Sequence, residues 1–122
     1  DGVIAYLNHL KSKDIEMAVF TNKPKELTNK TLKRHKIYSF FNYIVTSDDL
    51  EFKKPSPDGC YKLIEMSSIP PENIIMIGDS EVDQKSANSA SIAFFYHNVS
   101  SKEQAISGNT MKVFSNFNNL ID

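Results

Sequence analysis

Hydroxyl, amide, basic and acidic side chains follow three apolar segments of the chain, each at the point where a strand is expected to end. Thr21 and Asn22 follow the first segment, Lys54 lies in the loop region after the second, and Asp79 and Asp83 follow the third. Hydroxyl and backbone N–H groups hold phosphate oxygens, a lysine neutralises their charge, and carboxylates bind a hard cation that prefers oxygen ligands. Together these residues predict a site for a phosphate group bound with Mg²⁺.

Each of the three groups also has a purely structural interpretation. The acids of residues 79–83 could complement the dipole of the following helix, an effect of roughly 0.3–1 kcal/mol. Residues 21–22 could cap a helix, and residues 53–54 could be a solvated pair of charges. The order of the three groups, each after an expected strand, favours one shared site over three separate structural roles.

Hydrophobic periodicity alternates between the strand and helix patterns along the chain. Short apolar runs, several of them β-branched, predict strands at residues 15–20, 43–46, 74–77, 92–96 and 112–114. Amphipathic spacing, cap residues and prolines predict helices at residues 3–13, 24–34, 57–66, 80–90 and 116–121. Ser100 and Ser101, followed by Glu103 and Gln104, predict one further capped helical turn.

Strands that alternate with helices are typical of an α/β fold, in which a parallel sheet is covered by helices on both faces. The apolar run IIMI at residues 74–77 has no alternation, so it predicts a central strand buried on both faces. Ligands of such sheets bind beyond the carboxyl ends of the strands, so Thr21, Lys54 and Asp79 are expected to converge there. The length of 122 residues fits a single domain over residues 1–122.

Composition narrows the possible partners and the compartment. With 14 basic and 15 acidic residues, the chain has no charge excess that would attract nucleic acid or an anionic membrane. No apolar run is long enough to span a membrane and no leader pattern is present, so a cytoplasmic protein is expected. The single cysteine, Cys60, excludes an internal disulfide, and the three histidines share no spacing that suggests metal ligands.

Three stretches of the sequence carry a family resemblance: GVIAYLNHLKSKDIEMAVFTNKP at residues 2–24, KKPSPDG at 53–59 and IIMIGDSEVD at 74–83. They resemble the later conserved blocks of the haloacid dehalogenase-like (HAD) hydrolases, and the phosphoglycolate phosphatase-like branch is the most similar. The resemblance implies a three-layer Rossmann-like fold and a Mg²⁺-dependent phosphatase that acts on a small phosphorylated metabolite.

The same resemblance implies a role for each candidate residue. Thr21 would bind the transferring phosphoryl group with help from Asn22, and Lys54 would stabilise negative charge on the nucleophile and the phosphate. Asp79 would bind Mg²⁺ directly, while Asp83 would support the metal shell or orient the lysine.

The sequence departs from the family pattern at its most important motif. The family uses an aspartate nucleophile in an Asp-x-Asp-Gly motif at the end of its first strand, and no Asp-x-Asp occurs among these 122 residues. The mobile cap that commonly selects the substrate is also absent, and Ser91 stands where relatives usually carry glycine. The resemblance therefore implies that this chain by itself does not complete the family reaction.

Loss of the first strand also affects the predicted sheet. In relatives that strand is central and lies between the equivalents of residues 15–20 and 74–77, so the sheet is expected to be incomplete, with two exposed apolar strand edges. The core is then completed by an N-terminal segment outside this sequence, by a second copy of the chain, or by direct closure of the gap.

Two functions remain open. The first is the carboxyl-terminal core of a Mg²⁺-dependent phosphatase that is active when the missing segment is present. The second is a non-catalytic remnant that serves as a binding or interaction module. The discriminators between phosphatase, phosphomutase and dehalogenase activity lie in the part of the family pattern that this chain lacks.

Overall fold

A computed structural model describes residues 2–97, 110–114 and 116–120. The described residues form four α-helices: α1 (Val3–Ser12), α2 (Lys25–Arg34), α3 (Asp58–Ser67) and α4 (Glu81–Ser89). They also form five strands: β1 (Ala18–Phe20), β2 (Tyr43–Val45), β3 (Ile75–Gly78), β4 (Ala93–His97) and β5 (Thr110–Phe114). Short 3₁₀ turns lie at Tyr38–Phe40, Ser47–Asp49, Pro71–Asn73 and Phe117–Leu120. None of these helices is both long and apolar enough to cross a membrane.

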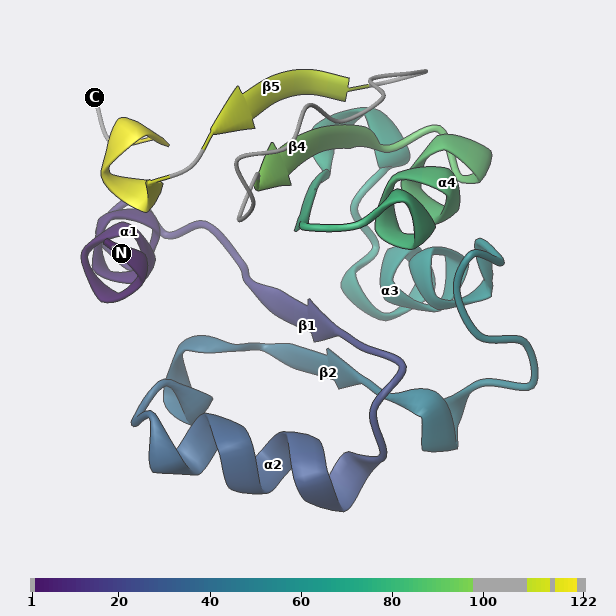
Figure 1. The fold of residues 1–122 in the computed structure, drawn as a ribbon, viewed down its shortest axis with the longest axis horizontal. Helices are drawn as coiled ribbons and strands as arrows, with labels where there is room; N and C mark the ends of the chain where they lie inside the picture. Colours follow the sequence, from purple (N-terminus) through teal and green to yellow (C-terminus); the bar gives the residue numbers. More distant parts are fainter. Residues whose placement is uncertain (1, 98–109, 115, 121–122) are drawn as a thin grey trace.

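The strands form two separate parallel sheets, shown in Figure 1. In the first sheet β1 pairs with β2, with Val19 opposite Ile44. In the second sheet β3 pairs with β4 and β4 with β5, and all of these pairs are parallel. Helix α3 packs on β1 and β2, whereas α4 packs on β3 and β4. The predicted α/β class, with parallel strands and packed helices, is confirmed.

The first strand is shorter than the sequence predicted. Residues 15–20 were expected to be extended, but the Ile15 N–H donates to Leu10 O and so belongs to the end of α1. The Met17 N–H then donates to the Asn42 side-chain oxygen, and regular pairing begins only at Ala18. Residues 15–17, which the apolar pattern assigned to the strand, therefore lie before it, and the first of them is bonded to the end of the helix.

Two other expectations need correction or lie outside the described residues. The predicted terminal helix at residues 116–121 is instead a 3₁₀ turn at Phe117–Leu120, which packs against α1. The predicted capped turn at Ser100 and Ser101 lies outside the described residues. Ser91, in place of the usual glycine, adopts a left-handed backbone with φ 59°, a conformation that disfavours residues with a Cβ atom.

Strand β3 is an edge strand and not the predicted central one. In the described part of the chain β3 pairs with β4 alone and β1 pairs with β2 alone. Ile75 is 52% exposed, so the continuous apolar run does not lie between two covering layers here. The two strand edges agree with the consequence expected from a missing first strand, and direct closure of the gap is not observed between β1 and β3.

One core nevertheless joins the two sheets. Its buried members come from α3, the end of α4 and the following strand: Cys60, Ala87, Ala90, Ile92, Phe94 and Tyr96. Phe20 of β1 packs against this cluster from the other sheet. Gly59 at the start of α3 provides the space, because a Cβ atom there would lie 2.2 Å from the Phe20 ring. The Phe20 ring therefore fixes the position of α3 relative to β1.

Gly59→Ala tests this close approach. In an unstrained helix, replacing glycine by alanine stabilises by roughly 0.5–1 kcal/mol. Here the methyl group would push the Phe20 ring out of its place, so we expect Gly59→Ala to destabilise the fold by about 1–3 kcal/mol in urea denaturation. Glu65→Ala, an exposed position of the same helix, is the control and should change stability little. A stabilised Gly59→Ala protein would contradict the packing.

Candidate functional site

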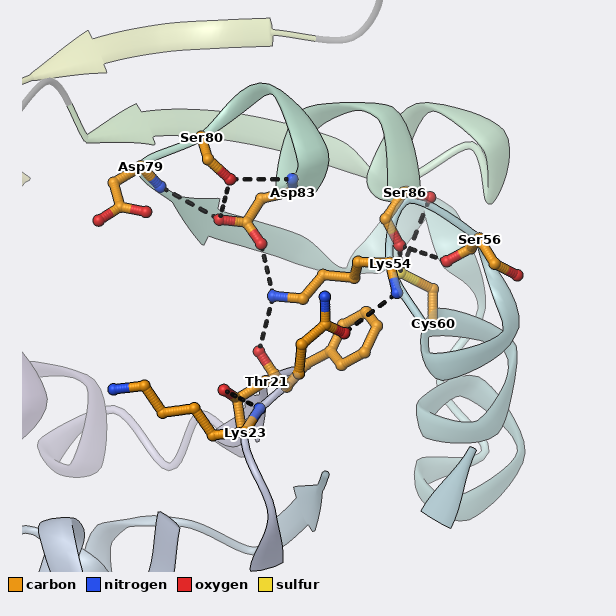
Figure 2. A network of polar contacts seen from close by, with 11 residues as sticks. Thr21, Lys23, Lys54, Ser56, Cys60, Asp79, Ser80, Asp83 and Ser86 are labelled. Carbon is orange, nitrogen blue, oxygen red and sulfur yellow. Dashed lines mark hydrogen bonds and ion pairs between the residues drawn. The ribbon is translucent and has the colours of Figure 1, made fainter. Parts of the chain in front are cut away.

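The Lys54 ammonium group lies between the two sheets (Figure 2). Its Nζ atom donates to the Phe20 carbonyl oxygen of β1 at 3.2 Å and to Asp83 Oδ1 of α4 at 2.5 Å. Nζ also lies 4.8 Å from the centroid of the Phe20 ring. The Lys54 and Asp83 side chains are only 10% and 11% exposed, so water screens this ion pair weakly. The lysine therefore connects the carboxyl end of β1 with the beginning of α4.

The Asn22 side chain contacts the backbone of the same lysine. The Lys54 N–H donates to Asn22 Oδ1 at 3.1 Å, across 32 residues of sequence. Lys54 itself sits in a turn that the Ser56 N–H closes on the Lys53 carbonyl oxygen at 3.0 Å. The amide that follows β1 therefore holds the loop that carries the ammonium group.

Thr21 lies one residue beyond β1, and Figure 2 shows it on the side of the Lys54 ammonium group. Its backbone N–H donates to Val45 O at 3.0 Å, which continues the pairing of the first sheet. Its Oγ1 accepts the Lys23 N–H at 3.1 Å. Because that oxygen already accepts a hydrogen bond, the hydroxyl proton can be donated to another acceptor.

Asp83 is 8% exposed, and both of its oxygens have partners. Oδ1 faces Lys54, while Oδ2 accepts the Ser80 hydroxyl at 3.1 Å and the Asp79 N–H at 3.3 Å. Ser80 in turn caps α4, since its Oγ accepts the Asp83 N–H. A Cβ atom at Gly78 would lie 2.6 Å from the Asp83 carboxylate, so glycine is required where the strand passes this side chain. The strand end and the helix cap therefore fix the carboxylate.

Asp79 is exposed, and Figure 2 shows its carboxylate directed away from that of Asp83. Among the described residues no group of three or more His, Cys, Asp or Glu side chains is arranged to hold a metal ion. Mg²⁺ is commonly held by one or two carboxylates together with water and phosphate oxygens, so a full protein cage is not required. Asp79 fits such an ion, whereas the Asp83 oxygens are already engaged by Lys54, Ser80 and the backbone.

The carboxylates of this region produce a negative local field. The pKa of Tyr96 is raised first by burial and then by the charges of Glu81, Asp79 and Asp83. Among the described residues, Lys54 is the cation in direct contact with one of these carboxylates. A phosphate dianion would therefore meet repulsion from the acids unless further positive charge were added.

A buried contact behind the Lys54 turn was not predicted from the sequence. Ser86 on α4 has no exposed surface, and its hydroxyl donates to the Ser56 carbonyl oxygen at 2.8 Å. The Cys60 thiol lies 3.6 Å from the same hydroxyl. The only available signal was spacing, because Ser86 follows Asp83 by three residues and so shares its helix face. Burial raises the pKa of the Cys60 thiol, and the hydrogen bond with Ser86 partly offsets this effect.

A surface groove of about 370 Å³ lies apart from these residues. It is lined by Asp49, Leu50, Glu51, Asp58, Tyr61, Lys62, Glu65 and Met66. Its four carboxylates and one lysine give it a net negative charge, which disfavours an anionic ligand. The groove therefore does not compete with the Lys54 region as a phosphate site.

Hydrogen bonds join four of the five predicted residues. Asn22 and Asp83 both bond Lys54, and the Asp79 backbone bonds Asp83. Thr21 lies beside them but shares no described hydrogen bond with the other four. The expected convergence beyond the strand ends is therefore present, whereas the role of each residue stays a prediction.

Comparisons with known proteins bear on the same stretches of sequence. The profile of a family described as haloacid dehalogenase-like hydrolase matches residues 1–96. A phosphoglycolate phosphatase of Pseudomonas putida is 34% identical over 91 residues, which are 75% of this chain and 34% of that protein. The chain thus spans about a third of the length of this relative.

Solved structures share the fold. A HAD-superfamily hydrolase from Ehrlichia chaffeensis is 28% identical, with a TM-score of 0.83 over 98% of this chain and 54% of that chain. A HAD phosphatase from Thermococcus onnurineus has a TM-score of 0.88 over 96% of this chain and 54% of that chain, at 23% identity. Both sheets are therefore arranged as in solved chains almost twice as long.

A double-mutant cycle tests the Lys54–Asp83 pair. Lys54→Met leaves a mostly buried carboxylate without its cation, and we expect it to lower the free energy of unfolding by about 3–5 kcal/mol. Asp83→Asn should also destabilise. The double variant should lose less than the sum by about 0.5–3 kcal/mol, measured by urea denaturation. Additive losses would show that the two side chains do not interact in solution.

The Cys60 thiol offers a test by pH. Because burial raises its pKa, Cys60 should stay protonated in the folded state at pH values where the unfolded chain is already ionised. Folding then gains stability from Cys60 below the ordinary thiol pKa and loses it as pH rises through the raised value. Thermal unfolding from pH 7 to 10 should therefore show a steeper decline for the natural protein than for Cys60→Ala. Parallel curves would contradict the raised pKa.

Proposed function

Because this chain belongs to the haloacid dehalogenase-like hydrolase family, we propose that it forms the carboxyl-terminal core of a Mg²⁺-dependent phosphatase for a small phosphorylated metabolite. The observation that carries the proposal is the Lys54 ammonium group held between the end of β1 and Asp83. Similarity to phosphoglycolate phosphatases supports that substrate class. We propose further that residues 1–122 act as one domain and that the protein is cytoplasmic.

Phosphate binding would use the groups that follow β1 and the Lys54 turn. The Thr21 hydroxyl would donate to a phosphate oxygen, since its own oxygen already accepts the Lys23 N–H. Lys54 carries three N–H donors, and the described residues accept two of them, through Phe20 O and Asp83 Oδ1. The third would be directed to the phosphate. Asn22 would act on Lys54 by holding its backbone.

Asp79 would be the protein ligand of Mg²⁺, which supplies positive charge to the phosphate when bound. Its exposed carboxylate and the negative field around it suit a hard divalent cation. Asp83 would act by fixing Lys54, because its two oxygens are occupied. The opposite charges of Asp83 and Lys54 attract each other where water screens them weakly, which holds the ammonium group in place.

The nucleophile would come from outside the Lys54 region. In the family it is the first aspartate of an Asp-x-Asp-Gly motif, and residues 1–122 contain no such motif. We propose that the isolated chain does not turn over phosphate esters and becomes active when a segment with the nucleophile is supplied. An N-terminal segment or a second copy of the chain would pair with the open edges of β1 and β3.

A second candidate function rests on the same missing motif. A non-catalytic HAD-like remnant could keep affinity for phosphate or Mg²⁺ and serve as a binding or interaction module. The coding sequence upstream of Asp1 distinguishes the two candidates. An Asp-x-Asp-Gly-Thr or Asp-x-Asp-Gly-Val segment there supports the phosphatase, and its absence supports the binding module.

Calorimetric titration with inorganic phosphate tests the binding half of the proposal. Residues 1–122 should bind phosphate more tightly when Mg²⁺ is present. Lys54→Ala should weaken binding by about tenfold or more, since a charge-assisted hydrogen bond is lost. Asp79→Asn should remove the effect of Mg²⁺. The control variants Lys62→Ala and Glu65→Gln each remove one charge from the separate surface groove. Both should bind phosphate as tightly as the natural chain does.

Turnover tests the catalytic half. In a longer protein that includes an upstream Asp-x-Asp-Gly segment, the rate of p-nitrophenyl phosphate hydrolysis should fall by about 100-fold or more in Asp79→Asn and in Lys54→Ala. Circular dichroism should confirm that each variant is folded. Unchanged rates in folded variants would reject the proposed roles.

A further inference from the structure

The Lys54 turn is held from two sides of the molecule. On one side, Asn22 Oδ1 accepts the Lys54 N–H at 3.1 Å. On the other side, the carbonyl oxygen of Ser56, two residues after Lys54, accepts the Ser86 hydroxyl at 2.8 Å. Figure 2 shows Ser86 and Ser56 beside the backbone of Lys54, at the opposite end of the side chain from Asp83. The ammonium group and the backbone of the lysine thus have separate anchors.

Both α4 anchors come from one helix face. Asp83 holds the ammonium group, and Ser86, three residues later, holds the turn that carries it. We propose that Ser86 is a positioning residue for Lys54, acting through the Ser56 carbonyl to fix where the lysine side chain begins. The consequence of this role for phosphate binding rests on the proposed function, whereas the effect of Ser86 on Lys54 does not.

Helix formation does not explain a serine at this position. Ser86 lies inside α4 with no exposed surface, where alanine has the higher helix propensity and brings no polar group. A buried helical serine commonly bonds the carbonyl four residues earlier on its own helix. Here the hydroxyl donates instead to a residue 30 positions away, in the turn next to Lys54.

A second fixed end matters because lysine has a long flexible stem. Four rotatable bonds separate the Lys54 backbone from its ammonium group, so an ion pair at the tip leaves the rest free to move. If a bound phosphate draws the ammonium group away from Asp83, the fixed turn still limits how far that group can move. Fixing the turn therefore keeps the lysine close to its working place in both arrangements.

Amine acylation of the complete 122-residue chain measures the proposed role directly. Acetic anhydride is added at low dose to the folded protein, and mass spectrometry gives the labelling rate of Lys54 relative to the exposed Lys53. Loss of the hydroxyl in Ser86→Ala should raise this ratio about three- to tenfold, the range expected for one hydrogen bond. Asp83→Asn, which frees the ammonium group itself, is the positive control.

Two further variants separate positioning from packing. Cys60→Ala alters the same contact between α3 and α4 but keeps the Ser86–Ser56 hydrogen bond, so its Lys54 ratio should equal that of the natural chain. Ser86→Thr keeps the hydroxyl and should keep Lys54 protected. A raised ratio in Cys60→Ala or in folded Ser86→Thr, or an unchanged ratio in Ser86→Ala, would overturn the proposal.

Phosphate affinity separates this inference from the proposed function. With Mg²⁺ present, Ser86→Ala should bind inorganic phosphate about three- to tenfold more weakly, while Cys60→Ala should not change. If the natural chain binds no phosphate, the proposed function fails, and the acylation ratios still decide the role of Ser86. If phosphate binds equally well to Ser86→Ala, Ser86 does not position Lys54 for that ligand and the proposal is rejected.

Discussion

The ion pair between Lys54 and Asp83 is the interaction on which the arrangement of the site depends. The two sheets share no backbone pairing in the described chain, and the Lys54 ammonium group connects them by bonding both Phe20 O and Asp83. Packing of the Phe20 ring on α3 adds the apolar part of the same connection. Because water screens this pair weakly, loss of either partner would leave a mostly buried charge unpaired at a large cost in free energy, so both side chains are held in place.

The sequence predicted the features that local chemistry determines. The helix predicted at residues 80–90 is α4, which begins directly after its Ser80 cap. Helices α1, α2 and α3 also lie within a few residues of their predicted limits. The order of strands and helices predicted the parallel α/β class, because strands that all run one way need crossover connections. The grouping of Lys54 with Asp79 and Asp83 followed from the rule that strand ends meet at one edge.

What the sequence could not predict depends on partners far away in the chain. The run at Ile75 was read as a central strand, yet burial of an apolar segment depends on a neighbouring strand that the described residues do not provide. The acceptor role of the Phe20 carbonyl was invisible because every residue has a backbone oxygen. Ser86 was missed since a helical serine has no distinctive pattern until its cross-helix acceptor, Ser56, is known.

The charge distribution limits how this site could handle phosphate. Burial raises the pKa of Tyr96, and the charges of Glu81, Asp79 and Asp83 at the start of α4 raise it further. Among the described residues, the lysine in an ion pair with one of these acids is Lys54, which is bound to Asp83. A phosphate dianion brought there alone would face more negative than positive charge, whatever hydrogen bonds Thr21 offered. A divalent cation at the exposed Asp79 carboxylate would reverse that balance, and the acids that repel phosphate are the same ones that would attract the cation. In the proposed chemistry, phosphate affinity at this site therefore depends on the cation, so phosphate binding and metal binding are linked.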